Sequence, residues 1–139
     1  MSKNRPQCGL ILENNEGKIL LQLRDDKPNL PYPGCWGTFG GQIEEGETPE
    51  EAIGREIKEE LNYELRDFEF FGNFPFDGYG IYMFRKRDTD ITIQDLTVRE
   101  GQGGKFLTLE EVIQLSCAFN CKEIVIAYFN QRDFPKNSA

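Results

Sequence analysis

Residues 41–63 read GQIEEGETPEEAIGREIKEELNY, and the rest of the chain can be placed around this stretch. It contains eight glutamates and two basic residues, so it carries minus six of the formal net charge of minus eight. A helix is predicted to begin at Pro49, because Thr48 can cap the first turn and Glu51 can complete a capping box. The stretch is therefore predicted to be a loop that leads into an acidic helix.

This helix is expected to have two different stripes side by side. One stripe is apolar, and the adjacent stripe carries carboxylates at positions i, i+3 and i+4. The members are Ile53, Ile57 and Leu61 on the apolar stripe, and Glu56, Glu59 and Glu60 on the acidic stripe. Each pair of like charges at this spacing costs roughly a few tenths of a kcal/mol. A bound Mg²⁺, which takes oxygen ligands, would offset this repulsion, whereas a solvated acidic face is the simpler alternative.

The spacing of the whole stretch resembles the Nudix box of the Nudix hydrolases. The matching residues are Gly41, then Glu47 after five residues, Arg55 and Glu56 after seven more, an aliphatic at Ile57, and the pair Glu59 and Glu60. The chain departs from the box at Asn62, where the box has glycine, and at Tyr63, where an aliphatic is usual. Asparagine tolerates the left-handed conformation of a helix C-cap better than other non-glycine residues, so Asn62 is expected to adopt it.

The resemblance implies a metal site built on the acidic stripe. Glu56 and Glu60 would bind Mg²⁺, for which Mn²⁺ could substitute, and Glu59 would be a further ligand or would hold a water molecule. The carbonyl of Gly40, just before the box, would join the metal shell. Outside the box, Glu100 at the head of a glycine-rich loop is the best-placed residue to supply another ligand or to activate water.

The implied reaction is hydrolysis of a nucleoside diphosphate linked to another moiety. The metal would withdraw charge from the diphosphate oxygens and help to form the attacking hydroxide. Arg55 would orient the catalytic glutamates, and Glu47 would pair with Arg55. Substrate choice depends on pockets outside the box. The absence of an extra N-terminal domain favours a nucleoside triphosphate, as in MutT-like enzymes. Nucleotide sugars and dinucleoside polyphosphates are the alternatives, and Tyr79 fits the dinucleoside type loosely.

The order of predicted elements indicates one α/β domain over residues 1–139. Alternating apolar positions and turn residues predict a hairpin, a proline-rich surface loop, further strands and a C-terminal helix. The strands are expected at residues 7–12, 18–24, 65–76, 80–85, 91–93 and 105–107, the loop at 25–34, and the later helices from Thr108 and at 123–131. With the resemblance, this order predicts a Nudix-type α/β/α sandwich with a mixed β-sheet.

Composition excludes several other classes of protein. Histidine is absent and the four cysteines form no CxxC pair, which argues against a zinc site. Reduced, mostly buried thiols are expected, and Cys117 and Cys121 could share a helix face. The acidic pI of about 4.6 disfavours nucleic acid or anionic membranes as partners. No apolar run suits a membrane span and the polar start is unlike a signal peptide, so a cytoplasmic location is expected. Whether the protein forms a homodimer is left open by the sequence.

Several side chains could have either a structural or a functional role. Trp36 and Phe39 are expected to be core residues, as are most of the aromatic residues between Phe68 and Phe84. Arg24 could meet a phosphate or be solvated, and the basic cluster at 85–87 is expected to be solvated. Two other functions also remain: a nucleotide-binding regulator without turnover, and a structural domain with a solvated acidic helix. The intact box carboxylates favour the enzyme over both.

Overall fold

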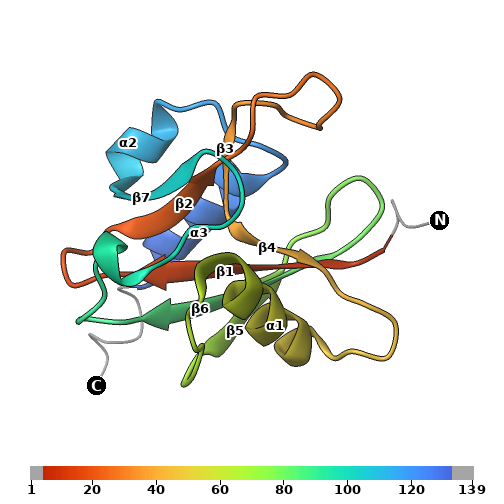
Figure 1. The fold of residues 1–139 in the computed structure, drawn as a ribbon, viewed down its shortest axis with the longest axis horizontal. Coiled ribbons are helices and arrows are strands. Elements are labelled where there is room, and N and C mark those ends of the chain that lie inside the picture. Colours follow the sequence, from red (N-terminus) through yellow and green to blue (C-terminus); the bar gives the residue numbers. More distant parts are fainter. Residues whose placement is uncertain (1–4, 133–139) are drawn as a thin grey trace.

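The computed structural model describes residues 5–132, and they form one mixed sheet with helices on both faces (Figure 1). The strands are β1 (Gln7–Glu13), β2 (Ile19–Leu23), β3 (Trp36–Gly37), β4 (Phe39–Gln42), β5 (Glu69–Asn73), β6 (Ile81–Arg87) and β7 (Gly103–Leu107). The helices are α1 (Pro49–Leu61), the 3-10 turn η2 (Ile93–Asp95), α2 (Leu109–Ile113) and α3 (Cys121–Arg132).

The sheet has the order β3-β2-β1-β6-β5, with β4 also paired to β1 and β7 also paired to β2. The pair β1 and β6 is parallel, from Gln7 opposite Ile81 to Glu13 opposite Arg87. All the other pairs are antiparallel. Figure 1 shows α1 on the near face of the sheet and α3 on the far face. The predicted α/β/α sandwich with a mixed sheet is confirmed.

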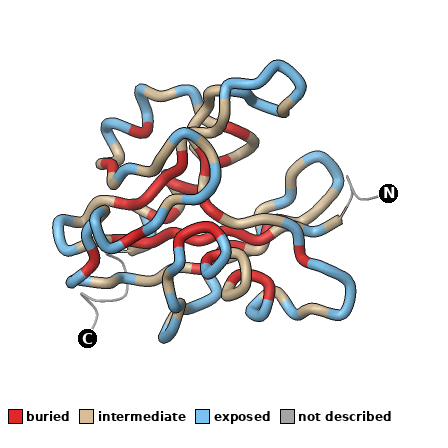
Figure 2. Tube along the Cα trace, in the orientation of Figure 1, coloured by how far each residue is buried: buried red, intermediate tan, exposed pale blue. Residues whose placement is uncertain are grey.

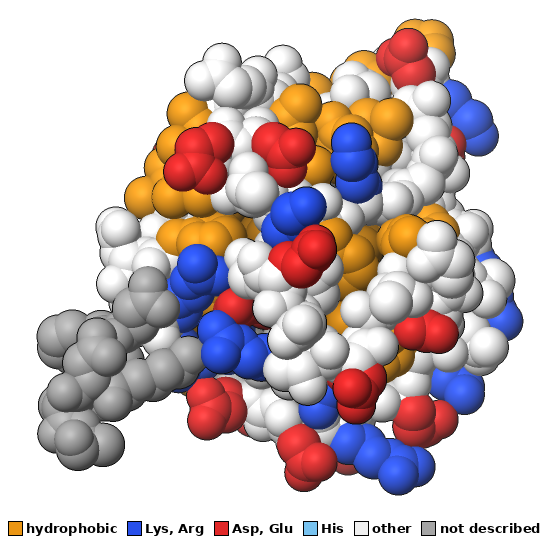
Figure 3. All heavy atoms as spheres, turned by 90° about the vertical axis from the view of Figure 1, so that its left-hand side faces the viewer, with side chains coloured by type: hydrophobic (Ala, Val, Ile, Leu, Met, Phe, Trp, Pro, Cys, Tyr) orange, Lys and Arg blue, Asp and Glu red, His pale blue; other side chains and the backbone are white. Residues whose placement is uncertain are grey.

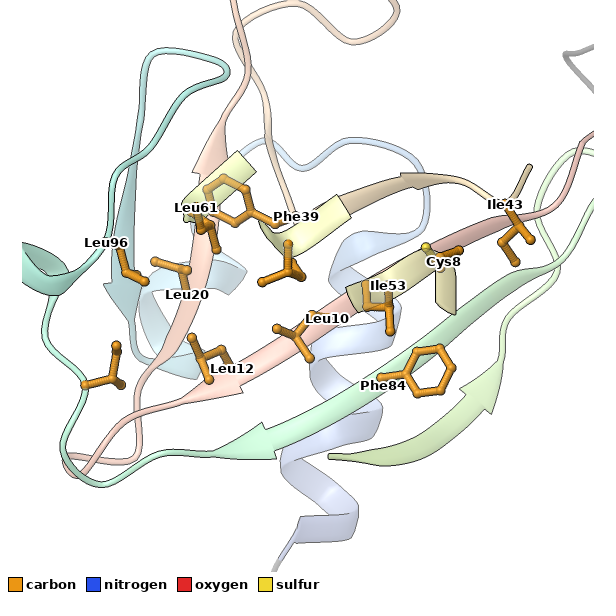
Figure 4. Close-up of a cluster of buried hydrophobic side chains, with 13 residues drawn as sticks. Cys8, Leu10, Leu12, Leu20, Phe39, Ile43, Ile53, Leu61, Phe84 and Leu96 are labelled. Atoms are coloured by element: carbon orange, nitrogen blue, oxygen red, sulfur yellow. The ribbon is translucent and has the colours of Figure 1, made fainter. Parts of the chain in front are cut away.

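Alternation along the strands separates two cores. Figure 2 shows that buried residues are concentrated on the central strands of the sheet. On β1, Leu10 and Leu12 face the cluster that includes Ile53 and Ile57 of α1, whereas Ile11 faces the cluster that includes α3. Figure 4 shows the α1 cluster, in which Leu10 and Ile53 lie close to Phe84. Each buried leucine or isoleucine stabilises the fold by about 1.5–3 kcal/mol. The apolar stripe of α1 therefore fixes which side of the helix faces the sheet.

One predicted strand and two predicted boundaries were wrong. Residues 91–93 form no strand: Ile91 is buried beside α1, while Ile93 begins the 3-10 turn, whose start is fixed by a hydrogen bond from Thr92 N to Asp95 Oδ2 of 3.0 Å. These apolar residues resemble a strand in the sequence because they pack against the core, although no neighbouring strand pairs with them. The strand predicted at 65–76 is confined to β5, and α3 begins at Cys121 rather than 123. For residues 135–139 the sequence predicts a frayed tail, and these residues lie outside the described part of the chain.

The aromatic predictions hold with one exception. Phe39 and Phe84 are buried, and Trp36 packs against the α3 cluster. Phe70, in contrast, is 53% exposed. On the face in Figure 3, acidic and basic side chains are interspersed among hydrophobic ones. A membrane-crossing helix, long and apolar throughout, does not occur within residues 5–132.

Candidate active site

Helix α1 begins and ends where its sequence predicts. Thr48 Oγ1 accepts from Glu51 N at 3.1 Å, and Glu51 Oε1 accepts from Thr48 N at 3.0 Å, which completes the capping box. At the other end, Asn62 adopts the left-handed conformation, with φ 53° and ψ 39°, and its N–H donates to Lys58 O at 3.0 Å. The left-handed C-cap predicted for Asn62 is confirmed.

Two glycines of β4 let the strand lie close to both β1 and α1. Gly40 N donates to Glu60 Oε1 at 3.1 Å. A Cβ on Gly40 would lie 2.1 Å from Cys8 O, and a Cβ on Gly41 would lie 2.5 Å from Glu56 Oε2. No side chain fits at either position without displacing backbone or carboxylate. Gly40 therefore allows the close approach of β4 to β1, and Gly41 leaves room for the carboxylate of Glu56.

Arg55 gathers the loop and the helix carboxylates around one guanidinium. Its Nε and Nη2 atoms donate to Glu47 at 2.6 and 3.0 Å, a two-point contact, and Nη2 also donates to Gln42 O at 3.1 Å. Its Nη1 atom donates to Glu56 Oε2 at 3.0 Å and to Glu59 Oε1 at 3.5 Å. The hydrogen bonds from Arg55 lower the pKa of Glu47 to about 2. The expected pair of Arg55 and Glu47 is thus present.

Glu60 is an almost fully buried carboxylate, with 7% of its surface exposed. Burial and the nearby side chains of Glu100 and Glu56 together raise its pKa to about 10, although the hydrogen bond from Gly40 N lowers it. The pKa of Glu56 is also raised, chiefly by burial, and its contact with Arg55 opposes that rise. Both groups hold protons more tightly than an exposed glutamate does.

Glu100 reaches Glu60 because its loop is fixed at several points. Arg99 N donates to Glu60 O at 2.9 Å, and Gln22 Nε2 donates to Glu100 O, also at 2.9 Å. Gly101 has φ 81°, and a Cβ there would lie 2.7 Å from Leu23 O. The loop therefore passes tightly over the end of β2. Gln22, a buried polar residue, is part of this arrangement, and the sequence contained no signal for its role.

The carboxylates suit a hard divalent cation by their chemistry. Oxygen ligands of this kind are preferred by Mg²⁺, and ionising the buried Glu60 requires a compensating positive charge nearby. Glu59 lies farther out, with its side chain 60% exposed and directed to Arg55. With the side chains in their present positions, no group of three or more acidic, histidine or cysteine residues in the described part of the chain could hold a metal ion. Binding by three carboxylates at once would require side chains such as Glu59 to rotate.

A cleft of about 500 Å³ opens beside these carboxylates and is within the size range of small-molecule sites. Its lining includes Glu56, Glu60 and Glu100, and also Phe119 and Asn120 from the turn before α3. The Nδ2 atom of Asn120 donates to Pro75 O at 3.4 Å, whereas its buried Oδ1 atom has no hydrogen-bond partner within residues 5–132. Sequence reasoning missed both residues of this turn, because nothing in the sequence places it beside α1.

Arg24, whose role the sequence left open, also lines the cleft. Its Nη2 atom donates to Pro31 O at 2.8 Å, and its guanidinium lies over the ring of Phe119, 5.3 Å from the ring centre. Arg24 thus holds the loop 25–34 against the turn before α3. The cluster at 85–87 is tied to other elements instead: Arg85 pairs with Glu69, and Arg87 pairs with the buried Glu13 at 2.7 Å. Arg87 is exposed, as expected for a solvated strand end, although it also pairs with Glu13.

Comparisons with known proteins place this geometry in context. A family model described as "NUDIX domain" matches residues 3–132. A curated protein named nucleoside triphosphatase NudI, from Enterobacter sp. (strain 638), is 44% identical over 55 residues, which are 40% of this chain and 38% of that protein. The match therefore spans about two fifths of the length of this curated relative.

Two solved structures share the fold at low identity. The NUDIX domain of Shewanella oneidensis NrtR, complexed with ADP ribose, has a TM-score of 0.77 and 18% identity, covering 92% of this chain and 88% of that one. The MutT protein from Methanosarcina mazei Go1 has a TM-score of 0.70 and 17% identity, covering 94% and 95%. At these identities the likeness concerns the fold.

Proposed function

The chain belongs to the Nudix family, and we propose that it hydrolyses a diphosphate linkage of a small nucleotide, with a nucleoside triphosphate as the preferred substrate. One observation carries this proposal: the buried Glu60 lies with Glu56 and Glu100 on the wall of a nucleotide-sized cleft. A solvated acidic helix would have no reason to bury one of its carboxylates in this way.

Glu56 and Glu60 are the proposed Mg²⁺-binding residues, with Glu59, Glu100 and the Gly40 carbonyl as further ligands. The cation, or Mn²⁺ in its place, would withdraw charge from the diphosphate oxygens and lower the pKa of water. The chain itself positions the carboxylates, because Gly40 N holds Glu60 and Arg55 holds Glu56. Each hydrogen bond favours one orientation of its carboxylate towards the cleft.

Three residues complete the proposed mechanism. Glu100 is exposed and lies beside Glu60, so it can accept a proton from an attacking water. Arg55 and Glu47 act at a distance from the reacting atoms. The two-point contact with Glu47 fixes the guanidinium plane, which in turn orients Glu56 and Glu59. We therefore regard Glu47 as a positioning residue.

The preference for a triphosphate rests on one partial relative, and the cleft adds support for binding of a nucleotide base. The partial relative is named a nucleoside triphosphatase. In addition, the unpaired Asn120 Oδ1 can accept a hydrogen bond from an N–H group of a base, and Phe119 beside it offers an aromatic surface. A dinucleoside polyphosphate is the second candidate, because Tyr79 also lines the cleft, and a nucleotide sugar is the further alternative. The acidic composition and free cysteines suit a cytoplasmic enzyme, and gel filtration would test whether it forms a homodimer.

The direct test is a panel of nucleoside triphosphates, nucleotide sugars and dinucleoside polyphosphates, assayed for phosphate or pyrophosphate release with Mg²⁺. The proposal expects the highest kcat/KM for a triphosphate. A nucleotide that binds without turnover would instead indicate a regulator, and neither binding nor turnover would indicate a structural domain. Either result would overturn the proposed activity.

Asn120 permits a sharper test of base recognition. Asn120→Ala should lower kcat/KM for the preferred triphosphate by about 10-fold or more, because it removes an acceptor from a site that selects an N–H group. Asn15→Ala, at an exposed turn, is the control and should leave the kinetics unchanged. If the two variants have equal kinetics, Asn120 does not contact the base.

A further inference from the structure

Two cysteines flank the turn that precedes α3. Cys117 lies before the helix and Cys121 is its first residue, and both are free thiols. The Cys121 thiol interacts with the Cys117 sulfur, which also lies 3.9 Å from the backbone oxygens of Val112 and Leu115. Cys117 is half-buried and accessible, whereas Cys121 is 4% exposed and lines the cleft. The pair thus joins an accessible thiol to a buried one.

The three residues between these cysteines form part of the cleft wall. Ala118, Phe119 and Asn120 all line the cleft. The turn is held by a hydrogen bond from Ala118 N to Trp36 O of 2.8 Å and one from Cys121 N to Ala118 O of 3.0 Å. Phe119 already has a left-handed backbone, with φ 53°. A covalent bond between the two sulfurs would close a small ring around this wall and change its shape.

We propose that Cys117 and Cys121 are a redox modification site, at which hydrogen peroxide forms a disulfide that reshapes the base-binding wall of the cleft. The formation of the disulfide stands on the contact between the thiols alone. Its effect on base binding rests on the proposed function.

The chemistry balances with peroxide as the oxidant. The Cys117 thiolate attacks one peroxide oxygen, the O–O bond breaks, and a sulfenic acid and hydroxide form. The Cys121 sulfur then attacks the sulfenic sulfur, the S–O bond breaks, and the oxygen leaves as water after taking the thiol proton. In sum, two thiols are oxidised to a disulfide and one peroxide is reduced to two waters.

The surroundings of the thiols assign these two roles. The hydrogen bond from Cys121 lowers the pKa of Cys117 to about 7, with help from the charge of Lys122, so Cys117 has thiolate available to attack peroxide. The pKa of Cys121 is raised, so this thiol stays protonated until a sulfenic acid has formed on Cys117. Cys8 differs from both, since burial raises its pKa to about 12. It is therefore expected to be inert.

Mass spectrometry can test the disulfide without any activity assay. Trypsin should release residues 106–122 as one peptide that holds both Cys117 and Cys121, while Cys8 and Cys35 fall in other peptides. After treatment of the folded protein with hydrogen peroxide and alkylation of free thiols, this peptide should carry no alkyl group and should be lighter than the reduced peptide by two hydrogen atoms. A reducing agent should reverse the change. If the peptide stays doubly alkylated while Cys35 is oxidised, the proposal is wrong.

Variants separate the two roles. Cys117→Ser should leave Cys121 unoxidised, whereas Cys121→Ser, which keeps a hydrogen-bond donor beside Cys117, should trap a sulfenic acid on Cys117 that a dimedone probe labels. Cys35→Ser is the matched control, because Cys35 is also half-buried, and it should form the disulfide like wild type. Oxidation of Cys121 in the Cys117→Ser variant at the wild-type rate would overturn the assignment of the nucleophile.

The effect on the cleft is measured separately. Oxidised wild type should have a KM for the preferred triphosphate raised by several-fold, with recovery on reduction, and Cys117→Ser should keep its KM in peroxide. A disulfide that forms without any change in KM would refute the reshaping of the wall but not the modification site. A protein without turnover on any nucleotide would refute the proposed function, and the mass measurement would still decide on the disulfide.

Discussion

Glu60 is the residue at which burial and charge conflict most directly. Its carboxyl has an ordinary pKa of 4.5 and a pKa of about 10 in the fold. The folded protein therefore keeps a proton that the unfolded chain releases as the pH rises between these values. By linkage, the metal-free protein loses stability over this interval, and below it the effect of Glu60 vanishes because both states are protonated. A bound cation would remove the conflict.

The first prediction follows from this conflict. Glu60→Gln should make the metal-free protein as stable as wild type at about pH 4, where both states of wild type are protonated, and more stable at about pH 9, because glutamine has no proton to lose. The same variant should lose most of the stabilisation by Mg²⁺ and at least about 100-fold in turnover. Melting curves at both pH values, with and without Mg²⁺, test this. Glu59→Gln, at an exposed position, is the control for stability. An apoprotein that unfolds on Glu60→Gln would show a structural role instead.

Gly41 provides the second prediction, on the space beside the carboxylates. Gly41→Ala would place a Cβ 2.5 Å from Glu56 Oε2, so it should displace that carboxylate and reduce both Mg²⁺ stabilisation and turnover. Gly54→Ala is the matched control, because a Cβ there meets nothing within 4 Å in the middle of α1. It should keep activity and raise stability by about 0.5–1 kcal/mol. Equal activity of the two variants would contradict the role given to Gly41.

At the scale of the element, α1 is defined by its two caps. The capping box at Thr48 fixes the first turn, and the left-handed Asn62 ends the helix where the chain turns towards Tyr63. Tyr63 itself packs on the α1 cluster and its hydroxyl donates to Asp88 Oδ2 at 2.6 Å. The end of the helix therefore determines where the chain continues.

The third prediction tests this helix end. Asn62→Gly should be neutral or slightly stabilising, whereas Asn62→Val should lose about 1–2 kcal/mol, because a β-branched side chain is strained in the left-handed region. Denaturant unfolding of both variants against wild type measures the difference. Equal stability of the two would contradict the C-cap assignment.

At the scale of the whole molecule, the site is assembled from parts distant in the chain. The loop with Glu100 is fixed by Gln22 of β2 on one side and by the end of α1 on the other. Both carboxylates with raised pKa must be ionised before they can bind a cation. Cation binding and the protonation of the site are therefore linked.

The fourth prediction concerns this linkage. Turnover should require a divalent cation, and the Mg²⁺ concentration needed for half-maximal activity should fall as the pH rises from about 6 to about 9, because bound Mg²⁺ must displace protons from the carboxylates. Activity measured over a grid of pH and Mg²⁺ concentration tests this. Full turnover in excess chelator would refute it.

The sequence by itself determined what depends on neighbours along the chain. The capping box, the conformation of Asn62 and the separation of α1 into apolar and acidic stripes follow from interactions within a few residues, and each was predicted correctly. The hairpin of β1 and β2 belongs to the same class. Ile91 shows the limit of such patterns, because the apolar residues of 91–93 were read as a strand although no strand lies alongside to pair with them.

Only the tertiary structure decided which carboxylate is buried and which other residues lie beside it. Both Glu59 and Glu60 lie on the acidic stripe, but the approach of Gly40 and of the loop with Glu100 buries Glu60 and leaves Glu59 exposed. Asn120 joins the same cleft from the far end of the chain. Burial depends on how segments separated by tens of residues pack together, and a local pattern carries no information about that packing.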